Sequence, residues 1–166
     1  MKVFLFSMLF SVVAFTFSFA QQSPRITTEG KNVSIAYGQP SKKGRTIFGA
    51  EGSQSLEKYN KIWRTGANKS TEITFNKDVK FGGQSVKAGT YTLFTIPGDK
   101  KWTVILNTVL GQSGAFEYEK NKSKDIVTVS VPAKKFKTSE EKLTFRVSDK
   151  SLEMQWDQEG FAVPIK

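Results

Sequence analysis

The residues best suited to chemistry are an adjacent tryptophan and arginine, Trp63 and Arg64, which precede a turn-forming run that ends at Asn68. A guanidinium can hold a carboxylate through two hydrogen bonds, and an indole offers a flat face for stacking. The pair therefore indicates a ligand-binding arginine beside an aromatic platform. The structural alternative places Trp63 in the core and pairs Arg64 with Glu72. It is favoured because buried arginines are usually paired.

A compact basic loop is a second candidate for ligand binding. Lys42, Lys43 and Arg45 surround Gly44 and follow Pro40. Such a cluster could bind phosphate, sulfate or an acidic polysaccharide. The glycine spacing of a phosphate-binding P-loop is not present. The alternative is a solvated hairpin tip, which is the usual fate of short charge runs.

The sequence contains no histidine and no cysteine. It therefore lacks the residues of Ser-His-Asp and Cys-His nucleophilic systems and of thiolate or imidazole metal sites. A metal would have to be a hard cation bound by oxygen, such as calcium, and no Asp-x-Asp-x-Asp-Gly loop is present, so we expect no metal and no cofactor. Acid–base chemistry would use Glu, Asp, Lys or Tyr. In that case Arg64 would hold a substrate carboxylate, and Glu72 or Tyr91 would move the proton. Glu117 and Glu119 form a possible carboxylate pair if they lie on a strand, but a solvent-facing strand is the favoured interpretation.

Aromatic side chains make up 13% of the chain. Some could line a face that stacks on sugar rings, and Tyr91 and Trp102 are the candidates for a site shared with the Trp63–Asn68 loop. The competing interpretation is core packing, which at this content takes most of the aromatic residues.

Alternation of apolar and polar residues dominates the chain after residue 32. Runs of strand length with β-branched and aromatic residues occur at 33–37, 71–75, 102–106, 126–131, 143–147, 152–156 and 161–165. Glycine, proline and aspartate turns separate them. The pattern predicts one all-β domain: an antiparallel β-sandwich, jelly-roll or immunoglobulin-like, of about eight to ten strands. Only residues 53–62 could hold a helical turn or two.

The first twenty residues have the layout of a secretory signal peptide. Lys2 precedes an uncharged run that ends in small residues at Ser18 and Ala20. We expect cleavage after Ala20, a flexible leader at 21–30 and the β domain at 31–166. No cysteine follows the cleavage site, so we expect an exported protein, periplasmic or extracellular, that carries no lipid and has no transmembrane anchor after cleavage. Removal of Lys2 leaves a net charge of +9.

Several motifs resemble those of one bacterial family. They are the run from Trp63 to Asn68, the segment Ala88-Gly89-Thr90-Tyr91 with residues 93–98, and Trp102 with Asn107. The chain is similar in these residues to the domain-of-unknown-function family numbered 2911. The resemblance implies an exported protein of bacteria with an outer membrane and implies no activity. Lys69 and Ser113 stand where many relatives have Glu and Trp.

The favoured hypothesis is a non-catalytic envelope or secreted binding module of unknown ligand. The ligand would contact the Trp63–Asn68 loop and the Lys42–Arg45 loop. Candidate partners are an anionic envelope polymer, a glycan or a protein. Nucleic acid is not expected, because the basic residues are scattered over turns and no recognition helix is present. The alternative hypothesis is a hydrolase or lyase that uses Glu, Tyr or Lys with Arg64 as the anchor of a substrate carboxylate.

Overall fold

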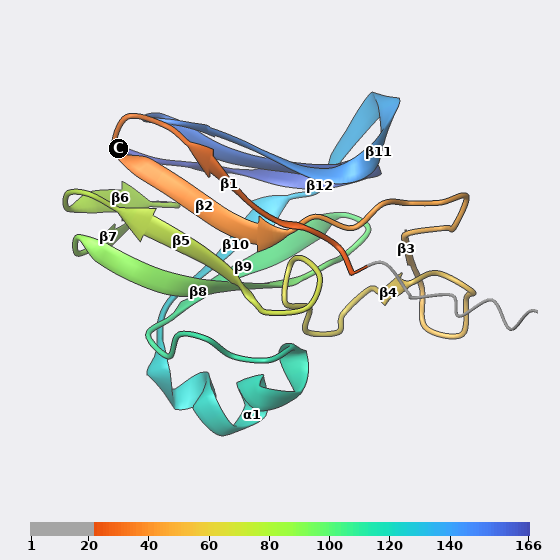
Figure 1. Ribbon diagram of the computed structural model, residues 1–166, viewed down its shortest axis with the longest axis horizontal. Helices are drawn as coiled ribbons and strands as arrows, with labels where there is room; N and C mark the ends of the chain where they lie inside the picture. The colour runs from red at the N-terminus through yellow and green to blue at the C-terminus, as the bar shows by residue number, and fades with distance from the viewer. Residues whose placement is uncertain (1–21) are drawn as a thin grey trace, which may run out of the picture.

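The computed structural model describes residues 22–166, and most of the regular structure there is β-strand (Figure 1). Six strands form one antiparallel sheet in the order β1-β2-β5-β8-β9-β10. They are β1 (Arg25–Glu29), β2 (Val33–Gly38), β5 (Thr71–Phe75), β8 (Gly89–Ile96), β9 (Lys101–Asn107) and β10 (Asp125–Pro132). The prediction of an all-β fold is confirmed.

A long antiparallel hairpin forms a second layer across one face of this sheet (Figure 1). Its strands are β11 (Lys134–Ser148) and β12 (Ser151–Pro164). Two smaller pairs complete the strands of the described region: the hairpin β6 (Val79–Phe81) and β7 (Gln84–Val86), and the short parallel pair β3 (Phe48–Gly49) and β4 (Glu57–Lys58).

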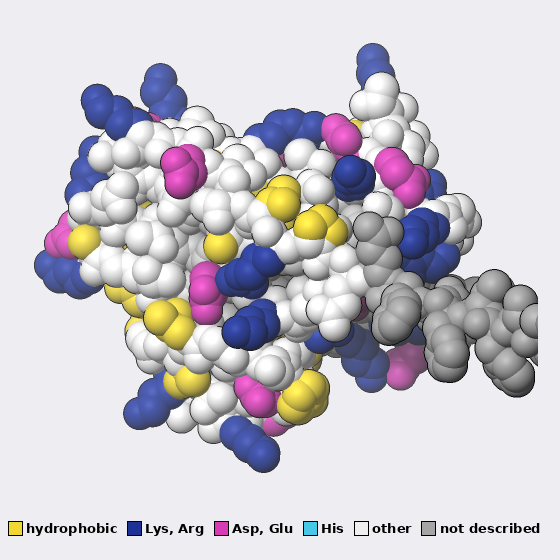
Figure 2. All heavy atoms as spheres, viewed as in Figure 1, with side chains coloured by type: hydrophobic (Ala, Val, Ile, Leu, Met, Phe, Trp, Pro, Cys, Tyr) yellow, Lys and Arg dark blue, Asp and Glu magenta, His cyan; other side chains and the backbone are white. Residues whose placement is uncertain are grey.

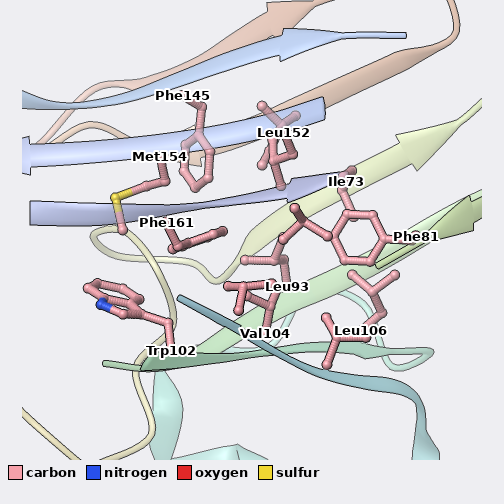
Figure 3. Packing of buried hydrophobic residues seen from close by; sticks show 14 of the residues in the cluster. Ile73, Phe81, Leu93, Trp102, Val104, Leu106, Phe145, Leu152, Met154 and Phe161 are labelled. Atoms are coloured by element: carbon pink, nitrogen blue, oxygen red, sulfur yellow. The ribbon is translucent and has the colours of Figure 1, made fainter. Parts of the chain in front are cut away.

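The core lies between the sheet and the β11–β12 hairpin. Figure 3 shows Phe145, Leu152 and Met154 from the hairpin facing Leu93 and Val104 of the sheet. All five side chains are buried. Period-two alternation produces this arrangement because successive side chains of a strand point to opposite faces, so one face of each strand is apolar. Full burial of each such side chain contributes roughly 1.5–3 kcal/mol.

Helical structure occurs in a different place from the one predicted. Residues 53–62 contain turns and the strand β4, because the main chain of Glu57 donates to Ile47 O and pairs with β3. A helical segment instead spans residues 115–124: a 3-10 turn (Ala115–Glu117), α1 (Tyr118–Asn121) and a second 3-10 turn (Lys122–Lys124). Glu117 and Glu119 therefore do not lie on a strand. Within residues 22–166 no helix has the length and apolar character needed to cross a membrane.

The prediction of a flexible leader at 21–30 does not hold for half of that range. Arg25–Glu29 forms β1 at the edge of the sheet and pairs with β2 in antiparallel register. Ile26 packs against the core, and Arg25 forms an ion pair with Glu72 of β5 at 3.0 Å. The predicted signal peptide lies outside the described residues.

Candidate functional site

The Trp63–Asn68 loop is held between neighbouring strands by main-chain and hydroxyl contacts. Trp63 exchanges two main-chain hydrogen bonds with Thr95 of β8, at 2.7 and 2.9 Å. The buried hydroxyls of Thr65 and Thr95 lie 3.0 Å apart, and Thr71 Oγ1 donates to Thr65 O at 2.8 Å. Each buried hydroxyl in this set has a partner, so the loop has a fixed shape.

A close approach to β2 fixes the other side of this loop. Ala67 N donates to Gly38 O at 3.1 Å, and a Cβ added at Gly38 would lie 2.0 Å from Ala67 O. Only glycine allows this contact. Asn68 has φ 63°, the left-handed conformation that its place after Gly66 predicts.

The aromatic residues predicted to form a platform are core residues. Trp63 is 3% exposed and stacks on Trp156 with ring centroids 6.1 Å apart, and Trp102 is fully buried. Tyr91 lies four residues before Thr95 on β8, roughly 13 Å along the strand, and its hydroxyl donates to Lys87 O at 3.0 Å. These rings offer no free face to a ligand and do not converge on one pocket, because the core between the layers takes them.

Arg64, in contrast, does not make the contact that the structural interpretation predicts. Its Nη1 donates to Asn68 O at 3.1 Å, and the half-buried guanidinium lies against Gly114. Glu72, the expected partner, instead pairs with Arg25 and accepts a hydrogen bond from Gly111 N at 3.0 Å. The Arg64–Glu72 pairing is therefore wrong, because β1 brings a different arginine to Glu72.

One carboxyl near Arg64 has a perturbed pKa. Burial raises the pKa of Glu57 from 4.5 to about 7, and the charges of Arg64, Lys58 and Arg45 lower it by smaller amounts. The ammonium group of Lys58 donates a hydrogen bond to Ser53 O at 2.9 Å. A carboxyl that titrates near neutral pH could accept or donate a proton.

The two predicted loops line two adjacent cavities that share a wall, and the pair of cavities is here called the Ser23 groove. It consists of two cavities of about 260 and 250 Å³, and Gln22 and Ser23 line both. The first cavity is also lined by Pro24, Gln39, Ser41, Lys43 and Lys142, and the second by Arg25, Gly38, Ala67, Asn68 and Lys69. Asn68 Nδ2 donates to Ser23 O at 3.0 Å and so attaches the shared wall to the motif loop.

Lys43 and Arg45 have different positions in the basic loop. Lys43 lines the groove, and its main-chain N–H donates to Glu141 Oε1 at 2.8 Å. Arg45 folds back on the loop and donates to Lys42 O at 2.9 Å and Ser41 O at 2.6 Å. Arg45 therefore fixes the loop that presents Lys43, and it is not among the residues that line the groove.

Asn107, the last of the motif residues, is the centre of a satisfied polar network. Its Nδ2 donates to Asn121 O at 2.8 Å and to Asp125 Oδ1 at 2.7 Å, and its Oδ1 accepts from Val109 N at 2.9 Å and from Gln112. Asp125 also accepts from the Tyr118 hydroxyl, which with burial raises the pKa of that phenol. The network attaches the helical segment to the sheet.

With this geometry in view, comparison with known proteins gives one match. The model of a family described as protein of unknown function (DUF2911) matches residues 19–165. The chain belongs to the DUF2911 family. No curated protein and no solved structure gives a significant match. The family description carries no activity, so the function of this DUF2911 protein has to be argued from its own residues.

Four features of the candidate site in this DUF2911 protein were not predicted from the sequence. They are the Gln22–Ser23 wall, Arg25, Lys142 and the carboxyl of Glu57. The first two fall in the predicted leader, and Lys142 reaches the groove only through the bridge between Ser41 and β11. Alternation in residues 25–29 was the available signal for β1. Among residues 22–166 no group of three or more Asp, Glu, His or Cys could hold a metal ion.

Proposed function

We propose that this protein is an exported, non-catalytic binding module that takes an anionic ligand in the Ser23 groove. The observation that carries the proposal is that the two candidate loops line adjacent cavities with a common wall. Lys43 comes from the basic loop and Asn68 from the motif loop, and each lines a cavity walled by Gln22 and Ser23. Neither cavity by itself would bring both loops to one ligand.

The charges along the groove support an anion as the ligand. Lys43, Lys69 and Lys142 are exposed and form no ion pair with another residue of the described region 22–166. Of the nearby carboxylates, Glu72 is paired with Arg25, and Glu141 accepts a hydrogen bond from Lys43 N. Unpaired lysines at both cavities attract a ligand whose negative charges are spread over its length, such as an acidic polysaccharide or a phosphate polymer.

The polar groups of the groove favour the charged parts of a ligand over its sugar rings. The amide of Asn68 and the hydroxyl of Ser41 can contact carboxylate or phosphate oxygens, whereas no aromatic side chain lines either cavity. Stacking on a sugar ring needs an exposed aromatic face. The ligand class is therefore set by charge.

Calorimetric titration with polygalacturonate and with polyphosphate, at low and moderate salt, tests this proposal. We expect salt-dependent binding to at least one of them. The double variant Lys43→Ser with Lys142→Ser should weaken it at least about fivefold, because each lost charge contact is worth roughly 0.5–1 kcal/mol. The matched control is Lys100→Ser with Lys101→Ser, which removes the same charge from exposed positions outside the groove.

The control variant distinguishes binding at the Ser23 groove from a general attraction of the polymer by the net charge of the protein. Equal weakening by the two double variants would mean that net charge alone attracts the polymer, and the groove proposal would be wrong. Absence of binding to both polymers would also contradict it. Unfolding midpoints of both variants show whether the fold is kept.

A second candidate function, hydrolysis or elimination, is favoured by one observation. The carboxyl of Glu57 titrates near pH 7, and Arg64 is the strongest of the charges that act on it. In this function Arg64 would hold a substrate carboxylate and Glu57 would move the proton. A panel of ester, glycoside and uronate substrates tests it: turnover should follow a midpoint near pH 7 and vanish in Glu57→Gln.

A further inference from the structure

Exposed large hydrophobic side chains gather on one part of the molecule. Among residues 22–166 four such side chains are exposed, and three of them belong to the segment 110–126. Phe116 is 74% exposed, Leu110 48% and Ile126 43%. Single exposed hydrophobics are ordinary, but three within seventeen residues need a reason.

The local structure holds these side chains outward. Ile126 lies at an irregularity in the β9–β10 register, between Asp125 and Val127, and a bulge of this kind redirects a side chain. Phe116 follows Gly114, where an added Cβ would lie 2.9 Å from Cε1 of the Phe116 ring. The segment is nevertheless attached firmly, because Tyr118 packs on Phe94 of β8 with ring centroids 5.1 Å apart.

Cations with no partner accompany these hydrophobic residues. Lys120 and Lys124 are exposed and form no ion pair within the described chain. The segment also holds three carboxylates: Glu119 pairs with Lys122 at 2.9 Å, and the partly buried Glu117 and Asp125 accept hydrogen bonds from Ser113 N and from the Tyr118 hydroxyl. Figure 2 shows hydrophobic side chains together with basic and acidic side chains around the part of the molecule that Figure 1 labels α1.

We propose that the segment 110–126 is a docking surface for an anionic lipid bilayer. Phe116, Leu110 and Ile126 would enter the boundary between headgroups and acyl chains. Lys120 and Lys124 would contact the lipid phosphates. Peripheral membrane binding uses this combination of apolar side chains and lysines, in which burial of the apolar residues adds to attraction by anionic lipids.

The shape of the segment favours a lipid surface over an acidic protein. Figure 1 shows the helical segment on the opposite side of the sheet from the β11–β12 hairpin, as a lobe of its own. The apolar side chains stand on its outside, and none of the cavities described above is lined by them. A projecting lobe can enter a soft, flat interface without a preformed socket. The surface is distinct from the Ser23 groove, so the two proposals can fail separately.

Co-sedimentation with vesicles tests the inference on the chain that begins at Gln21. The vesicles contain phosphatidylglycerol mixed with phosphatidylcholine, or phosphatidylcholine alone. We expect binding to the anionic vesicles only. Lys120→Gln with Lys124→Gln should lower the partition coefficient roughly 30-fold, since each lysine near an anionic surface contributes about 1 kcal/mol. Lys100→Gln with Lys101→Gln is the charge-matched control.

A second pair of variants separates docking from simple charge attraction. Leu110→Ser with Phe116→Ser keeps every charge and should lower the partition coefficient roughly tenfold. Leu56→Ser, at a residue that is 43% exposed outside the segment, should leave it unchanged. Wild-type binding by the Leu110/Phe116 variant, or no binding to anionic vesicles, would overturn the inference. Capture of an acidic protein through Phe116 without lipid binding would overturn it too.

Discussion

Replacement of Glu57 by glutamine should make the protein more stable at neutral and alkaline pH. Folding raises the pKa of this carboxyl from 4.5 to about 7, chiefly through burial. The folded state therefore prefers the protonated form. This preference is fully present below pH 4.5, and it is lost as the pH rises through about 7, where the buried group must ionise. Glutamine has nearly the shape of the protonated side chain and never ionises.

The expected magnitude follows from the pKa. One pKa unit corresponds to about 1.4 kcal/mol, so a rise from 4.5 to about 7 corresponds to about 3 kcal/mol. The side chain of Glu57 is only half-buried, and contact with solvent reduces the expected gain to roughly 1–2 kcal/mol at pH 8. At pH 4.5 the variant and the wild type should differ little.

Urea unfolding at pH 8 and pH 4.5, followed by tryptophan fluorescence, measures this difference. Glu51→Gln is the matched control on the same loop, because the Glu51 side chain is 78% exposed and its pair with Lys61 lies on the surface. The control should change the free energy of unfolding by less than about 0.5 kcal/mol at either pH. A Glu57→Gln protein that is less stable at pH 8, or that differs equally at both pH values, would refute the reasoning.

Three further predictions concern the fold and the export of the chain. Gly38→Ala should destabilise the protein by roughly 1–3 kcal/mol in thermal unfolding, because its Cβ would lie 2.0 Å from Ala67 O. Asn107→Ala should lower the free energy of unfolding by roughly 2–4 kcal/mol, since it leaves several buried partners without a hydrogen bond. Expression of the full chain in a bacterium with an outer membrane should yield a periplasmic or secreted protein whose mass corresponds to cleavage after Ala20; retention of the full-length mass would contradict export.

Strands with a clear alternation could be predicted from the sequence, and the others could not. β5 has buried side chains at alternate positions, so its period records which face meets the core. β1 has only Ile26 as a large apolar residue, because an edge strand buries little of either face. The helical segment depends on Asn107, which joins it to the sheet through contacts that no local pattern contains.

The candidate site shows the same division between local and long-range information. Lys43 and Asn68 stand in loops marked by turn residues and by charge, and both line the Ser23 groove. The core position of Trp63 was the favoured interpretation of the sequence, but its stacking on Trp156 of β12 is a long-range contact that the sequence does not contain. The raised pKa of Glu57 likewise depends on the burial of its carboxyl in the folded chain, which no local pattern contains.

The packing of the tryptophans gives the protein a built-in optical reporter. The chain has three tryptophans, and all of them lie in one cluster in which Trp63 is 6.1 Å from Trp156 and 6.3 Å from Trp102. Trp102 belongs to β9 of the sheet and Trp156 to β12 of the hairpin. Ultraviolet emission and near-ultraviolet circular dichroism therefore report on one place, the seam between the two layers. Separation of the hairpin from the sheet would change both signals before the strands themselves are lost.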